Sequence, residues 1–368
     1  QGQVQFVTGE PGSGKSLLVD VFIRRAMKRH PELLVVKGRC NAFTGIGDPY
    51  LPFSEMMAML TGDVEVRWAG GDISTQHARC LRSALPYSLQ VLLNVGEDLI
   101  DRFVAGGPLL ERAEAAAPDL AQQLRALRRS REASLKRFVD LKQLDLFKQY
   151  TRVLQKLSQR SALILFVDDL HWADPGSIGL LFHLGRRLEG SRILLIGAYR
   201  PQDLLFDMDP EIGENRRSLH SVINELQRSF GDITLDLDAL NGRKFVDAFI
   251  DTEPNCLDED FREVFYQHTA GRPLFSVELL RGLQIRGELI KDTAGKWIAS
   301  SNLDWKSIPP KVEAVIAERL KRLPPEWRAL LEAASVEGET FTAEVIAQVQ
   351  KVDEDQVCTL LSGPLSYK

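Results

Sequence analysis

Short apolar runs rich in β-branched residues recur along much of the chain. Such runs are typical of strands that are buried on both faces of a parallel sheet, with helices between them. The runs cover residues 4–8, 33–37, 163–167, 193–198 and 233–237. The pattern therefore predicts an α/β protein with a five-stranded parallel sheet.

The interval between the second and the third run has a different pattern. From residue 53 to about residue 160, apolar residues recur at helical spacing, and no alternation typical of a strand occurs. Breaks between helices are expected at Gly70-Gly71, Pro86, Gly106-Gly107-Pro108 and Pro118. We therefore predict a large helical insertion at about residues 53–160.

A basic run within this insertion has two interpretations. It contains Arg125, Arg128, Arg129, Arg131, Lys136 and Arg137. The run could bind an anionic partner, or it could be the solvated face of an amphipathic helix. The second interpretation is favoured, because an apolar stripe accompanies the basic residues: Leu124, Leu127, Leu135 and Phe138.

Beyond residue 240 the pattern is mainly helical. Helices are expected near 242–251, 258–269 and 274–286, and a hairpin between residues 288 and 299. Residues 307–310, which include Pro309 and Pro310, are a predicted linker. Short helical patterns follow near 311–322, 325–335, 342–349 and 354–361.

One motif directly follows the first predicted strand. Gly9-Glu10-Pro11-Gly12-Ser13-Gly14-Lys15-Ser16 fits the pattern G-x-x-x-x-G-K-[ST] of phosphate-binding loops. Glycines let such a loop turn its N–H groups towards phosphate oxygens, and the helix N-terminus adds positive potential. Lys15 is expected to contact the β- and γ-phosphates, and the Ser16 hydroxyl to bind Mg²⁺. Together with Leu17, these residues form the predicted ATP/ADP site; a glycine-rich turn with a chance lysine is the alternative.

Two carboxylates end the third predicted strand. Asp168 is expected to bind Mg²⁺ directly or through water, and Asp169 to polarise the attacking water. The alternative, that two aspartates merely end a strand, is disfavoured because open α/β sheets bind ligands along this edge.

Two further stretches are expected near the same edge. Asp174-Pro175 is predicted to cap a helix, and His171 could contact the nucleotide site, although a structural role is favoured for it. Arg200 follows the fourth strand, where an arginine would face the γ-phosphate; a surface arginine before a turn is the alternative.

Composition narrows the class of protein. The chain has 368 residues, enough for two or three domains, and a net charge of −5, which argues against direct nucleic-acid binding. Its four cysteines form no CxxC pair, so neither a zinc site nor a disulfide framework is expected. No apolar run approaches the ~20 residues of a membrane span, and no signal peptide is visible. A cytoplasmic protein without a membrane partner is predicted.

Together these stretches resemble the STAND class of P-loop ATPases, which is related to AAA+ proteins. They are most similar to bacterial multidomain transcriptional and signalling regulators, in which tetratricopeptide repeats often follow the ATPase region. The matching stretches are residues 9–16, 165–174, 197–200 and 271–275, and the resemblance continues through 312–349.

The resemblance implies roles for several residues. Arg200 would take the first-sensor position, where AAA+ motors usually have Asn or Thr, and Pro273 would pack on the adenine. Arg228 lies where AAA+ proteins often place a trans-acting arginine, which STAND proteins commonly lack; the alternative is a helix C-terminal cation. Gly271-Arg272 departs from the commoner Gly-Asn of relatives. A winged-helix histidine and an adenine-side segment before the first strand, present in relatives, have no match in this sequence.

The predicted organisation has three parts. Residues 1–239 would form the P-loop ATPase domain, 240–306 a helical lid with a hairpin, and 307–368 a truncated winged-helix-like region. The predicted function is a slowly hydrolysing ATPase switch that couples nucleotide state to winged-helix movement. Its expected partners are ATP, a protein or small-molecule inducer, and further copies of itself in a nucleotide-dependent oligomer. The alternatives are an AAA+ initiator or loader that acts on DNA, and a P-loop kinase.

Overall fold

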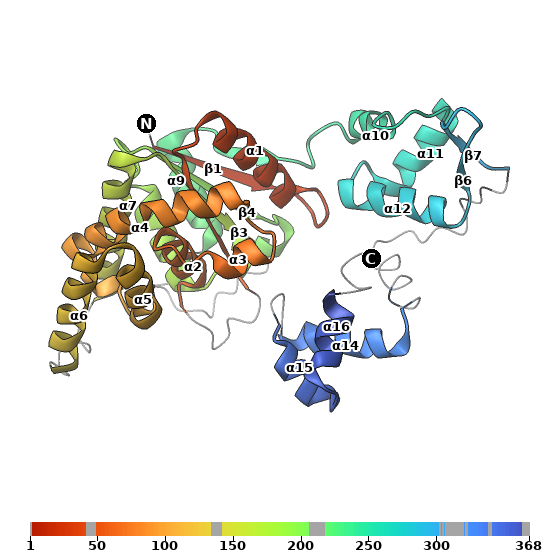
Figure 1. Cartoon of the computed structure of the whole chain (residues 1–368). Coiled ribbons are helices and arrows are strands. Elements are labelled where there is room, and N and C mark those ends of the chain that lie inside the picture. The colour runs from red at the N-terminus through yellow and green to blue at the C-terminus, as the bar shows by residue number, and fades with distance from the viewer. Residues whose placement is uncertain are drawn as a thin grey trace. The chain divides into compact units, whose positions relative to one another are not determined.

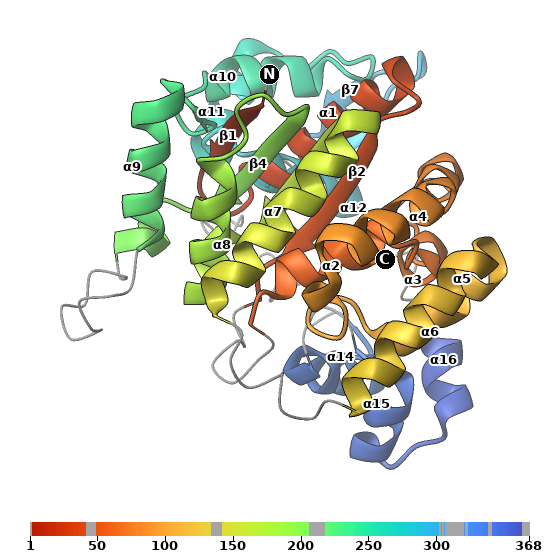
Figure 2. The ribbon, with the colours of Figure 1, turned by 90° about the vertical axis from the view of Figure 1, so that its left-hand side faces the viewer.

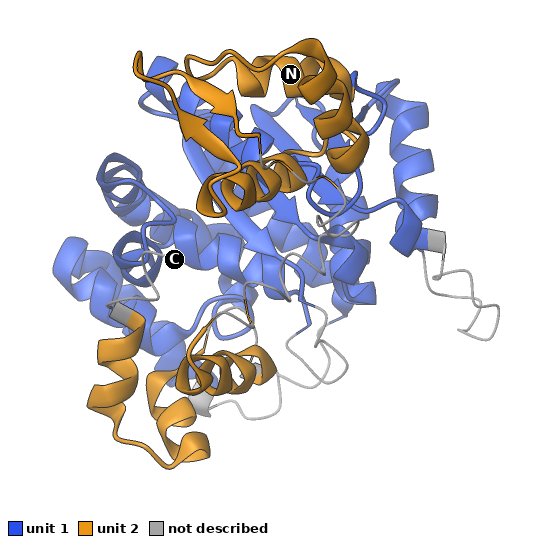
Figure 3. Ribbon diagram, turned by 90° about the vertical axis from the view of Figure 1, so that its right-hand side faces the viewer, with its two compact units in different colours: residues 1–241 blue, residues 242–368 orange. Residues whose placement is uncertain are grey.

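The computed structural model describes residues 2–41, 49–133, 142–205, 218–301, 303, 305, 320, 323–337 and 341–362. The chain divides into two compact units, residues 1–241 and residues 242–368 (Figure 3). Among the described residues, no helix combines the length and the apolar character that crossing a membrane requires.

The first unit is built on a five-stranded sheet with the strand order β2-β3-β4-β1-β5. Its strands β1, β3 and β4 are labelled in Figure 1. Its strands are β1 Gln3–Thr8, β2 Leu34–Arg39, β3 Leu163–Asp168, β4 Ile193–Tyr199 and β5 Thr234–Asp236. Every neighbouring pair is parallel. The predicted α/β fold with a five-stranded parallel sheet is therefore confirmed.

Both faces of the central strands β3 and β4 are buried, which explains why these two strands are almost continuously apolar. Alternate residues of β3 face opposite ways: Ile164 and Phe166 pack with Val19 and Ile23 of α1 (Lys15–Arg29). Leu165 belongs to the core on the other face. That face is covered by α7 (Gln143–Arg160) and α8 (Pro175–Gly185), with α9 (Leu219–Phe230) beside them (Figure 2).

The predicted helical insertion lies between β2 and β3. Its helices are α2 Leu51–Leu60, α3 Glu65–Ala69, α4 Thr75–Val95, α5 Gly106–Ala116, α6 Pro118–Ala133 and the already named α7. They share one continuous core with the sheet face that they cover. The described basic side chains of α6 include two that pair within the insertion: Arg125 with Glu114, and Arg131 with Asp98.

The predicted helix break at Pro86 is wrong, because Pro86 lies inside α4. A proline inside a helix costs about 3 kcal/mol. Buried leucines lie before and after Pro86 in the helix: Leu81, Leu85, Leu89 and Leu92. Each fully buried leucine contributes about 1.5–3 kcal/mol to stability. Packing of this stripe outweighs the missing backbone hydrogen bond, so the helix continues.

The described residues of the second unit form two separate hydrophobic clusters. The first joins α10 (Gly242–Ile250), α11 (Glu259–Thr269), α12 (Pro273–Ile285) and the antiparallel hairpin of β6 (Leu289–Lys291) and β7 (Trp297–Ala299). The second joins α14 (Pro325–Glu337), α15 (Ala343–Gln350) and α16 (Glu354–Ser362). The predicted linker and nearly all of the helix at 311–322 lie outside the described residues. The three-domain division and the winged-helix assignment stay predictions.

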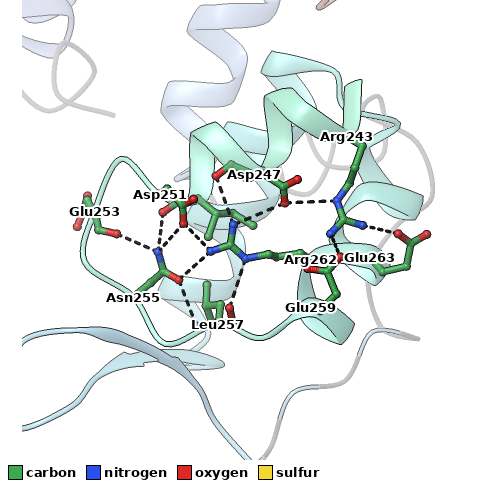
Figure 4. Close-up of polar contacts among 10 residues, drawn as sticks. Arg243, Asp247, Asp251, Glu253, Asn255, Leu257, Glu259, Arg262 and Glu263 are labelled. Carbon is green, nitrogen blue, oxygen red and sulfur yellow. Dashed lines mark hydrogen bonds and ion pairs between the residues drawn. The ribbon is translucent and has the colours of Figure 1, made fainter. Parts of the chain in front are cut away.

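Ion pairs and a close glycine contact fix the first cluster. Arg243 of α10 pairs with Glu259 and Glu263 of α11, and Arg262 pairs with Asp251 (Figure 4). Gly271, at φ +68°, lies so close to the Gly242 backbone that a Cβ there would come within 2.4 Å of it. The turn into α12 therefore requires glycine at this position.

Candidate functional site

The glycine motif forms the turn between β1 and α1. Gly12 and Gly14 have φ angles of 79° and 89°, in the left-handed region that favours glycine. Gly14 is the N-cap of α1, and its carbonyl accepts the Leu18 N–H at 2.9 Å. The loop therefore leads directly into a helix N-terminus, which suits an anionic ligand.

Lys15 is held inside this loop. Lys15 is only 8% exposed. Its Nζ donates hydrogen bonds to the carbonyl oxygens of Gly9 at 2.7 Å and Glu10 at 3.1 Å. Burial, followed by the positive charge of Arg200, lowers the pKa of Lys15, against the opposing effect of nearby carboxylates. The arrangement keeps a cation at the centre of the loop.

A contact from another strand anchors the loop. The Glu10 N–H donates to Asp238 Oδ2 at 2.8 Å, and Asp238 lies just beyond the end of β5. Sequence reasoning missed Asp238. Its position directly after a predicted strand, at the ligand-binding edge of a parallel sheet, is the signal that could have identified it.

The two predicted metal ligands lie together. Asp168 is the last residue of β3, and its carboxylate is hydrogen-bonded by the Ser16 side chain and, at 2.9 Å, by the Asp169 N–H. Burial raises the pKa of Asp168, and the Ser16 hydrogen bond opposes this rise. In the described part of the chain, no group of three or more His, Cys, Asp or Glu side chains could hold a metal. A hydroxyl and one carboxylate fit Mg²⁺, which keeps several waters and binds substrate phosphates.

Asp169 faces this pair in an unusual backbone conformation, with φ at +50°. Its Oδ2 accepts a hydrogen bond from Arg39 Nε at 2.8 Å, and its side chain is 14% exposed. Arg39 is the last residue of β2 and pairs in register with Asp168. Sequence reasoning did not single out Arg39, although an arginine at the end of a parallel strand is the signal that could have found it.

Arg200 follows β4 at the same edge of the sheet. Its Nη1 lies 3.8 Å from Asp203 Oδ2. Burial is the main cause that lowers the pKa of both Lys15 and His171, and the charge of Arg200 lowers both further. His171 Nε2 lies 3.8 Å from Asp169 Oδ1 and 3.5 Å from Asp203 Oδ2. The structure therefore brings Arg200 and His171 to the site and adds Asp203, which sequence reasoning missed.

The remaining residues singled out from the sequence lie on the helices α1, α8, α9 and α12. Leu17 is 60% exposed in the first turn of α1. Asp174 caps α8 through a 3.0 Å hydrogen bond from the Ser177 N–H, which confirms the predicted cap. Arg228 is exposed in the last turn of α9. Pro273 is the first residue of α12 in the second unit, and its contact with adenine stays a prediction.

Comparison with known proteins identifies the family. Residues 1–196, more than half of the chain, match the model of the AAA ATPase domain. The chain therefore belongs to the AAA ATPase domain family. No match was found among curated proteins.

Among solved structures, the chain is similar to the crystal structure of Cdc6p from Pyrobaculum aerophilum. The TM-score is 0.36 and the sequence identity is 12%, over 78% of this chain and 57% of that chain. The chain thus spans just over half the length of that protein. The finer assignment to the STAND class stays a prediction.

Proposed function

We propose that the chain is a regulatory switch that binds ATP with Mg²⁺, hydrolyses it slowly, and passes its nucleotide state to the second unit. One observation carries this proposal. Five side chains lie together at the carboxyl ends of β1, β3 and β4: those of Lys15, Ser16, Asp168, Asp169 and Arg200.

Nucleotide binding follows from the loop. The backbone N–H groups of Gly12, Gly14 and Lys15 would contact phosphate oxygens, and the Lys15 ammonium would exchange its contacts with the loop carbonyls for the β- and γ-phosphates. Ser16 and Asp168 would hold Mg²⁺, which neutralises phosphate charge when it is bound.

Hydrolysis would use Asp169 as the proton acceptor. Asp169 directly follows Asp168, and its backbone N–H donates to Asp168 Oδ1 at 2.9 Å. Its carboxylate would therefore lie near the expected position of the γ-phosphate, where it would orient a water for attack. Arg200 would stabilise charge on the γ-phosphate oxygens. Arg39 holds one oxygen of Asp169, and this contact is consistent with slow turnover because it competes with the water.

Loss of the contact between Arg39 and Asp169 is expected to increase the rate of ATP hydrolysis. Arg39→Ala should raise steady-state phosphate release by up to about fivefold, the factor that corresponds to an exposed ion pair worth ~1 kcal/mol. Arg82→Ala is the matched control, because Arg82 pairs with Glu65 at 2.8 Å within the helical insertion. A large decrease in the Arg39 variant would instead place Arg39 among the groups that bind phosphate.

The switch would depend on the γ-phosphate. ATP and ADP differ only there, where Lys15, Asp168 and Arg200 would converge, and a ligand shifts an equilibrium only through its different affinity for two states. Pro273 would carry the difference from the adenine into α12 and the helices beyond it. ADP would favour a closed form and ATP an open form, with an inducer or self-association acting on this equilibrium.

Hydrogen exchange tests the switch. In the wild-type chain, amide protection of α12 and of α14–α16 should differ between saturating ADP and a non-hydrolysable ATP analogue. Arg200→Ala should bind both nucleotides and give the same protection with each, because the group that distinguishes them is removed. Identical wild-type protection in both states, with binding of both demonstrated by titration, would reject the switch and leave a plain ATPase.

A further inference from the structure

His171 has a buried side chain whose two ring nitrogens make no hydrogen bond to the described residues. Its side chain is 0% exposed, and neither Nδ1 nor Nε2 has a hydrogen-bond partner in the described structure. A buried polar group that stays unpaired costs free energy, so its surroundings should offer it a partner after a small movement. The predicted structural role does not explain why the ring lies between two carboxylates.

Those carboxylates belong to Asp169 and Asp203. His171 lies in the short helix η2 (Leu170–Trp172) and Asp203 in η3 (Gln202–Leu205). The distances from Nε2 are 3.8 Å to Asp169 Oδ1 and 3.5 Å to Asp203 Oδ2, whereas an N–H···O hydrogen bond extends to about 3.2 Å. A small shift of either carboxylate would complete a hydrogen bond with the ring.

Each carboxylate also faces an arginine. Asp169 Oδ2 accepts from Arg39 at 2.8 Å, which leaves Oδ1 towards His171. Asp203 Oδ2 is buried without a hydrogen bond and lies 3.8 Å from Arg200 Nη1. The five side chains therefore form a continuous row, in the order Arg39, Asp169, His171, Asp203, Arg200, across the ends of β2, β3 and β4.

Through Nε2, the ring can donate a hydrogen bond to only one carboxylate at a time. A neutral imidazole that carries its proton on Nε2 has one N–H donor there. Burial lowers the pKa of His171, which favours the neutral ring, although Asp169 opposes this shift. The two carboxylates therefore compete for one donor.

We propose that His171 is a positioning residue whose Nε2–H is shared between Asp169 and Asp203, so that the contact between Asp203 and Arg200 controls the freedom of Asp169. This inference rests on the proposed function. When Arg200 contacts the γ-phosphate it leaves Asp203, which then accepts the His171 hydrogen bond. Asp169 Oδ1 is thereby freed to accept a proton from the attacking water. When the γ-phosphate is gone, Arg200 returns to Asp203, and His171 donates to Asp169.

Substitutions of His171 separate this role from simple packing. His171→Phe keeps a planar ring but removes the donor, whereas His171→Gln places an amide N–H near the position of Nε2. The kcat of His171→Phe should fall by about 10–100-fold, as is typical for a residue that acts through another, with little change in KM. His171→Gln should restore most of the rate. His183→Gln is the matched control, because His183 is 6% exposed, bonds to Thr151 in the core, and should leave kcat unchanged.

A double-mutant cycle tests the coupling. Asp203→Ala should lower kcat, and the combination with His171→Phe should be no slower than the slower single variant, because both break the same row. An ¹⁵N spectrum of the imidazoles gives a readout beyond activity. The His171 Nε2 signal, assigned through His171→Gln, should differ between ADP and a non-hydrolysable ATP analogue, and this difference should disappear in Asp203→Ala.

The outcomes separate the two proposals. Wild-type protein that neither binds nor hydrolyses ATP would overturn the proposed function and this inference together. Wild-type turnover with an unimpaired His171→Phe variant would overturn the inference alone. If His171→Phe and His171→Gln lost the same amount of rate and the same amount of thermal stability, His171 would be a packing residue. This result would also overturn the inference.

Discussion

Replacing Lys15 with alanine should weaken ATP binding by roughly 100-fold or more, since hydrogen bonds to a charged group contribute about 1.5–3 kcal/mol each. Lys15 is the buried cation of the loop, and its Nζ reaches two loop carbonyls at 2.7 and 3.1 Å. The affinity can be measured by titration with a fluorescent ATP analogue in the presence of Mg²⁺.

The control for this variant must separate binding from folding. Lys148→Ala removes an exposed lysine of α7 that pairs with its helix neighbour Asp145, and it should bind ATP as the wild type does. The thermal unfolding temperature of Lys15→Ala should be compared without nucleotide. A folded Lys15→Ala protein with wild-type affinity would mean that the loop is structural.

Replacing Asp169 with asparagine should leave ATP binding nearly intact but reduce phosphate release by about 10²–10⁴-fold, the usual contribution of a general acid–base group. Asparagine keeps the shape of the side chain and still accepts a hydrogen bond from Arg39, but it loses the charge that would take a proton from water. Steady-state phosphate release and nucleotide titration, measured on the same preparation, distinguish the two effects.

Asp145→Asn is the control for a charge loss elsewhere on the same unit, because Asp145 is a half-buried residue in the first turn of α7. It should hydrolyse ATP at the wild-type rate. If Asp169→Asn also does so, Asp169 is not the proton acceptor, and Arg39 would then hold an inert carboxylate.

The parts of the site that could be predicted are those that are local in sequence. Residues 9–16 follow a strand and begin a helix within one continuous stretch, so their conformation is set by their own glycines and neighbours. Asp168 and Asp169 could be placed because a strand end is visible from its apolar residues, and the carboxyl ends of parallel strands meet at one edge.

The contacts that could not be predicted join residues far apart in the sequence. Arg39 meets Asp169 because β2 and β3 are neighbours, and His171 meets Asp203 because η2 and η3 follow adjacent strands. Apolar runs predict strands but not their order in the sheet. Pro86 illustrates a second limit, since the packing that keeps it inside a helix depends on the tertiary core.

The placement of the helical insertion has a consequence for how the chain folds. Leu34 of β2 is directly opposite Leu163 of β3, although the whole insertion separates them in sequence. Closing so long a loop adds little to its equilibrium cost, about 0.6 kcal/mol per doubling of length, but non-local pairing is slow. The insertion shares a core with the strands, so its helices can collapse first and bring the two strand ends together. The register of the catalytic edge would then be set late, and the insertion would act as an internal folding scaffold for the sheet.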